Sequence, residues 1–175
     1  LEITTFQQQE LQRLGVQVRT GTRLDAAAIA AAGADAVIVA TGSRPAASSL
    51  PCDGSVDVLA PAEVIAQLQT GTSHWQGRRV TVVDGVGHFP AYAPAEALAA
   101  AGASVTLVTA RLHAAILLDN GSMINTLRRL GQAGVKVLSQ TATLRVEAGT
   151  VHARHVFSGE LQAWPCDAVV AALGN

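Results

Sequence analysis

Short apolar runs alternate with amphipathic stretches along this chain, and two of the runs have nearly the same form. Residues 34–42 read ADAVIVATG, and residues 166–174 read CDAVVAALG. Uninterrupted runs of Val, Ile and Ala are typical of strands buried on both faces of a parallel sheet. Two interpretations of the likeness are open: convergence of two buried strands, or two strands of one domain that an inserted domain interrupts.

The first third of the chain predicts an α/β unit followed by a connection. A helix that begins near Phe6 is expected to end at Gly15, the usual residue just past a helix C-terminus. Further elements are predicted from periodicity: strands at 16–19 and 36–40, and helices at 25–33 and 60–71. Gly, Pro and Ser are frequent between residues 41 and 54, which predicts a loop.

From Val80 onwards the pattern is strand, loop, helix, strand, which is a βαβ unit with parallel strands. A second helix at 122–133 and a strand at 135–138 extend this unit. Polar and apolar residues then alternate from 142 to 164 around a Glu-Ala-Gly-Thr turn, which predicts an antiparallel hairpin. The run at 168–172 follows as another buried strand. This order favours one interrupted domain, with residues 35–42 and 167–174 paired in one sheet.

Composition limits the function classes. The 175 residues are 49% hydrophobic and 14% charged, with a formal net charge of −1, which suits an α/β protein and gives no electrostatic reason for binding nucleic acid or an anionic membrane. The sequence shows neither an apolar stretch of about twenty residues nor a signal peptide pattern, so we expect a cytoplasmic location. Cys52 and Cys166 lack CxxC partners, so two reduced thiols and no metal site are expected.

The chain opens on Leu1 rather than on methionine and stops at Asn175, directly after a strand and glycine. We therefore expect it to be an excerpt of a longer protein that is not active alone.

The candidate chemistry lies after Val83, where Gly85-x-Gly87-x-x-Pro90 matches two of the three glycines of a dinucleotide-binding turn. Proline replaces the third glycine, and with Pro94 it suggests that the helix starts only around Ala93. The loop would then be longer than a tight phosphate turn. Asp84 stands at the mouth of this turn, where its carboxylate repels a pyrophosphate unless it is turned away to cap the following amides.

Two further residues bear on the same site. An NAD site prefers an acidic residue after the second strand, but Thr109 and Ala110 stand there, with Arg111 just beyond. Arg111 suits either a 2′-phosphate or an exposed surface position. His88 is the histidine placed at the mouth of the site. The sequence offers no zinc ligand set, Walker lysine or catalytic triad, so no catalytic residue is assigned.

Four segments together resemble a known family. They are LQRLGVQVRTGT, DAVIVATGSRP, the stretch from Arg78 to Thr109, and CDAVVAALGN. They are similar to the C-terminal half of the old-yellow-enzyme-like multidomain flavoprotein oxidoreductases, the trimethylamine dehydrogenase and 2,4-dienoyl-CoA reductase family. The most specific part is the phrase from Val82 to His88 with the helix and strand that follow.

The resemblance implies an NAD(P)-type Rossmann-like domain inserted into part of a second, FAD-type α/β domain. It implies the following division: 1–45 and 163–175 as parts of the FAD/ADP-type domain, 46–77 as a linker, and 78–162 as the NAD(P)-type domain. Thr41, Gly42 and Gly174 match positions that approach the FAD-type nucleotide. With these, Asp84, Gly85, Gly87, His88 and Arg111 complete the predicted cofactor-binding set.

The resemblance also implies cofactors and partners. FAD or ADP and NAD(P) belong to the part of the family that this chain matches, whereas the FMN barrel and the iron–sulfur cluster belong to an upstream part that it lacks. The remainder of the parent polypeptide is the expected partner, and an electron-transfer protein is a candidate. Two functions stay open. One is the nucleotide-binding region of an NAD(P)H- or flavin-dependent oxidoreductase, of the amine dehydrogenase or enoate reductase type. The other is a Rossmann-like module that has lost its nucleotide and serves as a structural or docking domain.

Overall fold

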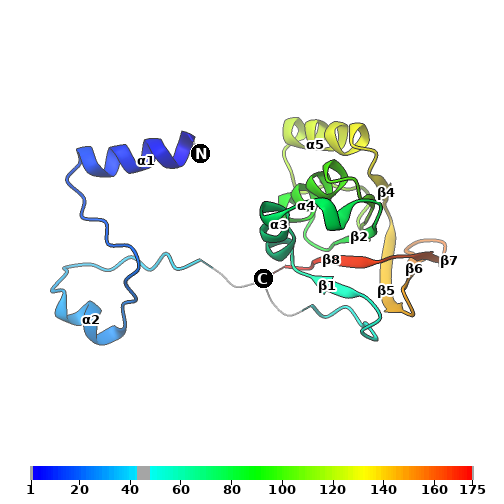
Figure 1. The fold of residues 1–175 in the computed structure, drawn as a ribbon, viewed down its shortest axis with the longest axis horizontal. Coiled ribbons are helices and arrows are strands. Elements are labelled where there is room, and N and C mark those ends of the chain that lie inside the picture. The colour runs from blue at the N-terminus through cyan, green and yellow to red at the C-terminus, as the bar shows by residue number, and fades with distance from the viewer. Residues whose placement is uncertain (1, 43–47, 175) are drawn as a thin grey trace. The chain divides into compact units, whose positions relative to one another are not determined.

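The computed structural model describes residues 2–42 and 48–174, which belong to two units, residues 1–42 and 43–175 (Figure 1). Unit 1 contains two helices, α1 (Glu2–Arg13) and α2 (Ala26–Ala31). Gly15 has a φ of 69°, which ends the first helical stretch as predicted. The Asp25 side chain accepts the Ala28 N–H at 2.8 Å and caps α2.

The strands predicted at 16–19 and 36–40 do not form within unit 1. A strand needs a neighbour for its N–H and C=O groups, and the described residues of unit 1 supply none. Between residues 3 and 42 no side chain is buried, although the sequence there is rich in Val and Ile. Unit 1 therefore has helices but no core of its own.

Unit 2 is built on a parallel sheet with the strand order β1-β8-β2-β3-β4, in which every pair is parallel. Its strands are β1 (Asp57–Leu59), β2 (Arg79–Asp84), β3 (Ser104–Val108), β4 (Lys136–Leu138) and β8 (Ala168–Ala172). Helices α3 (Pro61–Thr70), α4 (Phe89–Ala100) and α5 (Asn120–Gln132) complete the βαβ pattern. This is the α/β, Rossmann-like fold class that the sequence predicts.

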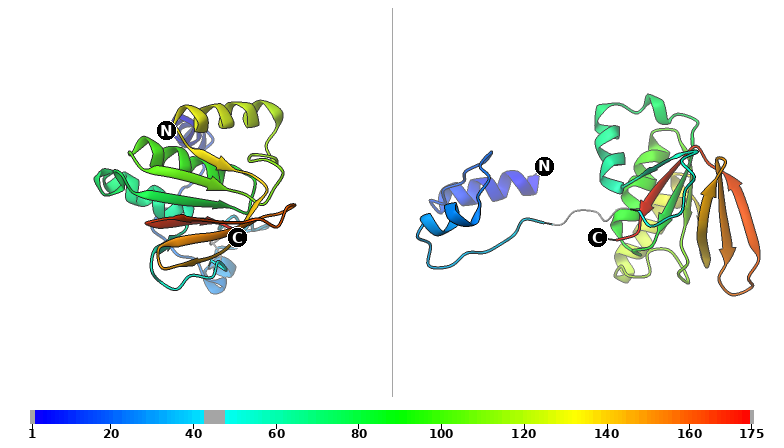
Figure 2. Two further views of the ribbon diagram at one scale, coloured as in Figure 1. Left: turned by 90° about the vertical axis from the view of Figure 1, so that its right-hand side faces the viewer. Right: turned by 90° about the horizontal axis from the view of Figure 1, so that it is seen from below.

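A second sheet is antiparallel, with the order β5-β6-β7. Its strands are β5 (Thr141–Glu147), β6 (Thr150–His155) and β7 (Leu161–Pro165). The predicted hairpin is confirmed: Ala148 and Gly149 both have positive φ values between β5 and β6. Figure 2 shows the helices of unit 2 and this antiparallel sheet on opposite sides of the parallel sheet.

The alternation of side chains along the central strands explains the three layers. Ala168, Val170 and Ala172 of β8 pack into the core under the helices, whereas Val169 packs with Val146 and Val151 of the antiparallel sheet. Successive residues of a strand point to opposite faces, so a continuous apolar run is needed where both faces are covered. The buried runs that predicted these strands are a direct consequence.

The predicted pairing of residues 35–42 with 167–174 is wrong. Both edges of β8 are taken, by β1 on one side and β2 on the other, in registers that join Val58 to Val169 and Val82 to Val170. The second apolar phrase is thus β8, an interior strand of the parallel sheet of unit 2. The likeness of the two phrases does not make them neighbours, because many buried parallel strands draw on the same few residue types.

Within the segment that we expected to be a linker, the helix predicted at 60–71 is confirmed as α3, whereas β1 and a 3₁₀ turn (Ser73–Trp75) were not predicted. All three elements pack into unit 2. Val64 and Trp75 are fully buried there. Asp53 and Ser55 also tie this segment to the β5–β6 turn: the Asp53 carboxylate accepts the Ala148 N–H at 2.8 Å, and the Ser55 hydroxyl accepts the Gly149 N–H at 2.9 Å.

One side chain anchors β8 at the start of the sheet. The Asp167 carboxylate accepts the Arg79 backbone N–H at 2.8 Å and the Arg79 Nε–H at 3.0 Å, and it forms an ion pair with the same guanidinium. Hydrogen bonds from the Arg79 side chain and backbone lower the pKa of Asp167 from 3.8 to about 2.

This anchor predicts acid-dependent stability. Folding favours the ionised form of Asp167. Its contribution to the free energy of unfolding is therefore fully present above the pKa that Asp167 has in the unfolded chain, and it is lost as the pH falls through about 2. We expect Asp167→Asn to lower the urea midpoint near pH 6, and the difference from the wild type to shrink between pH 4 and pH 2.

Asp57→Asn is the matched control, because Asp57 is exposed and forms no ion pair among the residues that the structure describes. Equal urea midpoints for Asp167→Asn and the wild type at pH 6 would contradict the assignment.

Candidate functional site

The candidate site lies at the carboxyl edge of the parallel sheet, where β2 ends at Asp84. Only four residues, Gly85 to His88, separate it from α4, which begins at Phe89. The longer loop and the helix start near Ala93 that we predicted are therefore wrong. Pro90 falls in the first helical turn, where its missing N–H costs no helical hydrogen bond, and Pro94 is accommodated inside the helix and buried.

Asp84 is turned into the loop and caps it, which is the second of the two orientations considered above. Its Oδ1 atom accepts the N–H of Val86 at 3.1 Å and the N–H of Gly87 at 2.6 Å. The side chain of Asp84 is almost fully buried, with 3% exposed. A carboxylate that binds the amides two and three residues later is a familiar turn device of Asp.

Tyr92, on α4, holds the other carboxylate oxygen. Its hydroxyl donates to Asp84 Oδ2 at 2.7 Å and accepts the Ala115 N–H at 2.6 Å. Burial raises the pKa of Tyr92, and the hydrogen bond to the Asp84 carboxylate raises it further. The phenol therefore stays protonated as the donor that fixes Asp84.

Arg111 reaches back from the loop after β3 to the same turn. Its Nη2 atom donates to the Gly85 carbonyl at 3.0 Å. Its Nε atom is buried and has no hydrogen-bond partner among the described residues. Arg111 thus contacts the turn itself instead of extending along the surface.

The space beside Gly87 is filled. Gly87 has a φ of 68°, a conformation that favours glycine. A Cβ atom built on it would lie 3.0 Å from Arg111 Nε and 3.2 Å from Leu117 Cγ. Leu117 also donates its N–H to the Gly87 carbonyl at 3.3 Å. The loop between β3 and α5 therefore covers the turn where a phosphate would approach.

The other predicted residues divide between the two units. Gly174 has a φ of 107°, and a Cβ on it would lie 4.0 Å from Val86 Cγ1, so Gly174 borders the turn. His88 is exposed at the N-cap of α4, and its ring packs edge-on against Phe89. Thr41 and Gly42 belong to unit 1. Within unit 2 the structure thus gathers Asp84, Gly85, Gly87, His88, Arg111 and Gly174 at one edge of the sheet.

Sequence reasoning missed Tyr92, Ala115 and Leu117. Tyr92 is the only tyrosine in the chain and comes eight residues after Asp84, which is the one signal that was available. Nothing in the sequence indicates that the Ala115 amide and the Leu117 side chain lie against the turn, because they come from a loop of irregular backbone in which Ala115 has a φ of 62°.

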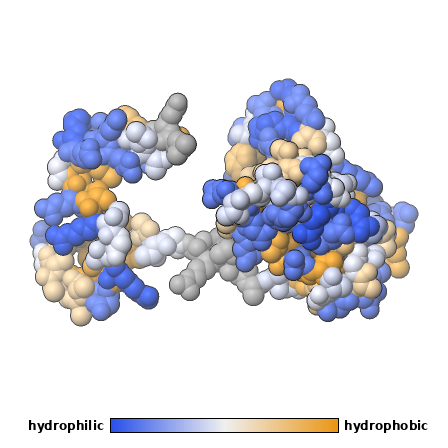
Figure 3. Space-filling view, viewed as in Figure 1, coloured by the Kyte–Doolittle hydropathy of each residue, from blue (hydrophilic) through white to orange (hydrophobic). Residues whose placement is uncertain are grey.

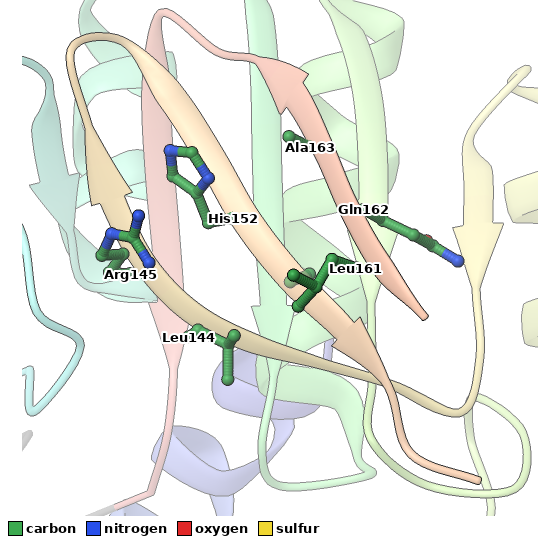
Figure 4. A pocket seen from close by; sticks show the side chains of 7 residues that line it. Leu144, Arg145, His152, Leu161, Gln162 and Ala163 are labelled. Carbon is green, nitrogen blue, oxygen red and sulfur yellow. The ribbon is translucent and has the colours of Figure 1, made fainter. Parts of the chain in front are cut away.

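A shallow hollow of about 180 Å³ lies elsewhere, on the outer face of the antiparallel sheet (Figure 4). A bulge in β5 after Thr143 places Leu144 and Arg145 beside His152 of β6 and Leu161 of β7. Arg145 is paired with Glu147 at 3.0 Å. This hollow is in a different layer from the glycine turn and is not part of the nucleotide-type site.

Among the residues that the structure describes, no helix is long and apolar enough to cross a membrane. No group of three or more His, Cys, Asp or Glu side chains in that part of the chain is placed to hold a metal ion.

A family model identifies the family of the chain that carries this site. The model for pyridine nucleotide-disulphide oxidoreductases matches residues 29–175, which is most of the chain. The chain belongs to this family. Its members are oxidoreductase flavoprotein domains that bind FAD and NAD(P).

Individual relatives agree with the pyridine nucleotide-disulphide oxidoreductase assignment. The chain is 32% identical over 146 residues to an N,N-dimethylglycine/sarcosine dehydrogenase of Chromohalobacter salexigens, covering 82% of this chain and 21% of that protein. Histamine dehydrogenase from a Rhizobium species is 27% identical in structure alignment, with a TM-score of 0.78 over 91% of this chain and 26% of that one. A 2-naphthoyl-CoA reductase shares the fold, with 19% identity and a TM-score of 0.75 over 95% of this chain and 24% of the reductase.

These matches confirm the resemblance to the trimethylamine dehydrogenase and dienoyl-CoA reductase family. This chain spans about a fifth to a quarter of the length of these relatives.

The Tyr92 hydroxyl gives a testable prediction about the site. Tyr92→Phe removes the donor to Asp84 Oδ2 and the acceptor for the Ala115 N–H, so these two buried atoms lose the partner shown for them. We expect a loss of about 1–3 kcal/mol in the free energy of unfolding, measured by urea titration.

Thr126→Val is the matched control, because the Thr126 hydroxyl is also buried and has no partner among the described residues. Its removal is expected to leave the stability unchanged or raised. A Tyr92→Phe variant no less stable than Thr126→Val would argue against the network.

Proposed function

We propose that this chain is the nucleotide-binding-type region of a larger flavin-dependent oxidoreductase of the amine dehydrogenase type. The observation that carries the proposal is the match over nearly the whole chain to amine-oxidising relatives. By their names, the relatives that are 32% and 27% identical to the chain in the aligned region act on N,N-dimethylglycine, sarcosine or histamine. The reductase has 19% identity, which supports a shared fold alone. An enoate or acyl-CoA reductase is therefore the weaker candidate.

Unit 1 supports the view that the chain works within a longer polypeptide. Apolar side chains lie open on its surface (Figure 3), among them Ile38 with 92% exposed and Val39 with 75% exposed. A β-branched run of this kind is costly to leave in water. We propose that residues 36–40 complete a parallel sheet of an FAD/ADP-type domain whose other strands come from the parent polypeptide, with Thr41 and Gly42 facing its nucleotide.

The NAD(P) expected of the family does not fit unit 2 well. A pyrophosphate would take the N–H groups of the glycine turn, but Asp84 already accepts those of Val86 and Gly87. For this reason a second function is proposed beside the first: within the parent, unit 2 acts as a structural domain or as a docking domain for an electron-transfer protein, without a nicotinamide nucleotide. Under this second function no nicotinamide nucleotide contacts the candidate residues, which mark the place of an ancestral nucleotide site. They are Asp84, Gly85, Gly87, His88, Arg111 and Gly174.

The first proposal is tested on the full-length polypeptide that contains this chain. We expect its flavin absorption to bleach anaerobically on addition of a small secondary or tertiary amine, because an amine substrate reduces the flavin directly. Bleaching by NADPH, with turnover of an enoate and none of an amine, would assign the reductase type instead.

The second proposal is tested by isothermal titration of the chain with NADPH, NADH and ADP. We expect weak binding or none, because the amides of the turn are occupied and a buried carboxylate stands beside them. A sub-micromolar dissociation constant for either nicotinamide nucleotide would refute it.

A further inference from the structure

We infer that Asp84 is the residue that excludes dinucleotides from unit 2, because its carboxylate acts as the internal anion of the glycine turn. The inference rests on the proposed loss of nucleotide binding and adds the residue responsible. It names one side chain, Asp84, as the cause of the lost nucleotide binding. Pro90, the most visible departure from the glycine fingerprint in the sequence, is not the cause.

The donors of the turn are the first reason. A phosphate at this position binds the backbone N–H groups between the strand and the helix. Asp84 Oδ1 accepts the N–H groups of Val86 and Gly87, and the Gly85 N–H donates to the Ala172 carbonyl at 2.9 Å. The N–H groups of Gly85, Val86 and Gly87 are therefore all hydrogen-bonded within the chain.

Charge and rigidity are the second reason. Asp84 is 3% exposed, and Tyr92 holds its second oxygen at 2.7 Å. The carboxylate therefore cannot swing into solvent without leaving the buried Tyr92 hydroxyl without its acceptor. A phosphate group would meet a fixed like charge at short range in a poorly solvated place, where repulsion is strong.

The loop over the turn is linked to the same carboxylate. Tyr92 joins Asp84 to the Ala115 amide, and Leu117 lies against Gly87 two residues later in that loop. Asp84 thus blocks the donors directly and, through Tyr92, helps to keep Leu117 over the turn.

Beneath this cover the turn keeps the features that bind phosphate. The loop has four residues, Gly87 has a positive φ, and α4 starts directly after it. The proline at position 90 lies in the first helical turn, where it displaces nothing. Arg111 adds a buried Nε–H donor without a partner among the described residues, next to Gly87. Removal of the internal anion should therefore expose an anion site.

The experiment compares Leu117→Ala with the double variant Asp84→Ala/Leu117→Ala, and the probe is sodium pyrophosphate in isothermal titration. Both variants open the space over Gly87, and they differ only in the carboxylate. We expect the double variant to bind pyrophosphate at least about tenfold more tightly than Leu117→Ala. Arg111→Gln added to the double variant should reverse the gain, because it removes the cationic donor.

Amide hydrogen exchange is the second measurement, and it reports on the wild-type chain. We expect protection of the Val86 and Gly87 N–H groups that is retained in Asp84→Asn, which keeps an acceptor oxygen, and lost in Asp84→Ala. Asp84→Asn/Leu117→Ala is the matched control for the occupied amides. It should gain less pyrophosphate binding than Asp84→Ala/Leu117→Ala, because its amide oxygen still accepts the Val86 and Gly87 N–H groups although the charge is gone. If Asp84→Ala does not fold, the exchange of these two N–H groups in the wild type still tests the inference.

Three results would overturn the inference: pyrophosphate binding by Leu117→Ala that equals the double variant, no binding by a folded double variant, or rapid exchange of both amides in the wild type. None of these depends on the substrate of the parent enzyme. Tight binding of NADPH by the wild-type chain would instead refute the proposed loss of nucleotide binding.

Discussion

The parallel pairing of β8 with β2 is the constraint on which unit 2 depends. Its register sets Ala172 opposite Asp84, so both strands end at the same level and the Gly85 amide donates to the Ala172 carbonyl. Leu173 and Gly174 then lie beside the glycine turn. At the other end of the two strands, Asp167 holds Arg79 and fixes this register. Both faces of β8 are buried. A shift of its register by one residue would turn Val169 toward the helices and Ala168 and Val170 toward the antiparallel sheet, which would disrupt the cores on both faces at once.

The carboxyl edge of this sheet combines an inherited geometry with a changed chemistry. Strand, four-residue turn and helix stand as in a dinucleotide-binding unit, and the family assignment agrees with that geometry. The groups that would bind a ligand, however, are hydrogen-bonded to one another. Asp84 binds the turn amides and the Tyr92 hydroxyl, and Arg111 binds the Gly85 carbonyl. Such a site satisfies the Asp84 carboxylate, the Tyr92 hydroxyl and the N–H groups of the turn without a ligand, which lowers the free energy of the empty state and leaves little to gain from binding.

The two units differ in what they can do alone. Unit 2 has buried cores on both sides of its parallel sheet, whereas unit 1 has exposed valine and isoleucine and no buried side chain between residues 3 and 42. This contrast agrees with relatives that are four to five times longer than the matched region. The buried cores lie in unit 2, and the exposed valine and isoleucine of unit 1 are the residues that the proposed sheet of the parent polypeptide would cover.

The sequence by itself determined the class of the fold, the helices with their glycine ends, the buried strands and the place of the glycine turn, because these follow from local periodicity and backbone preference. It also determined the kinship, since the phrase from Val82 to His88 is specific. Only the tertiary structure decided which strands are neighbours: β8 lies between β1 and β2, although its sequence also fitted a partner at 36–40. It likewise decided the orientation of the Asp84 carboxylate, because Tyr92 and the loop that carries Ala115 and Leu117 reach the turn through contacts that no local pattern records.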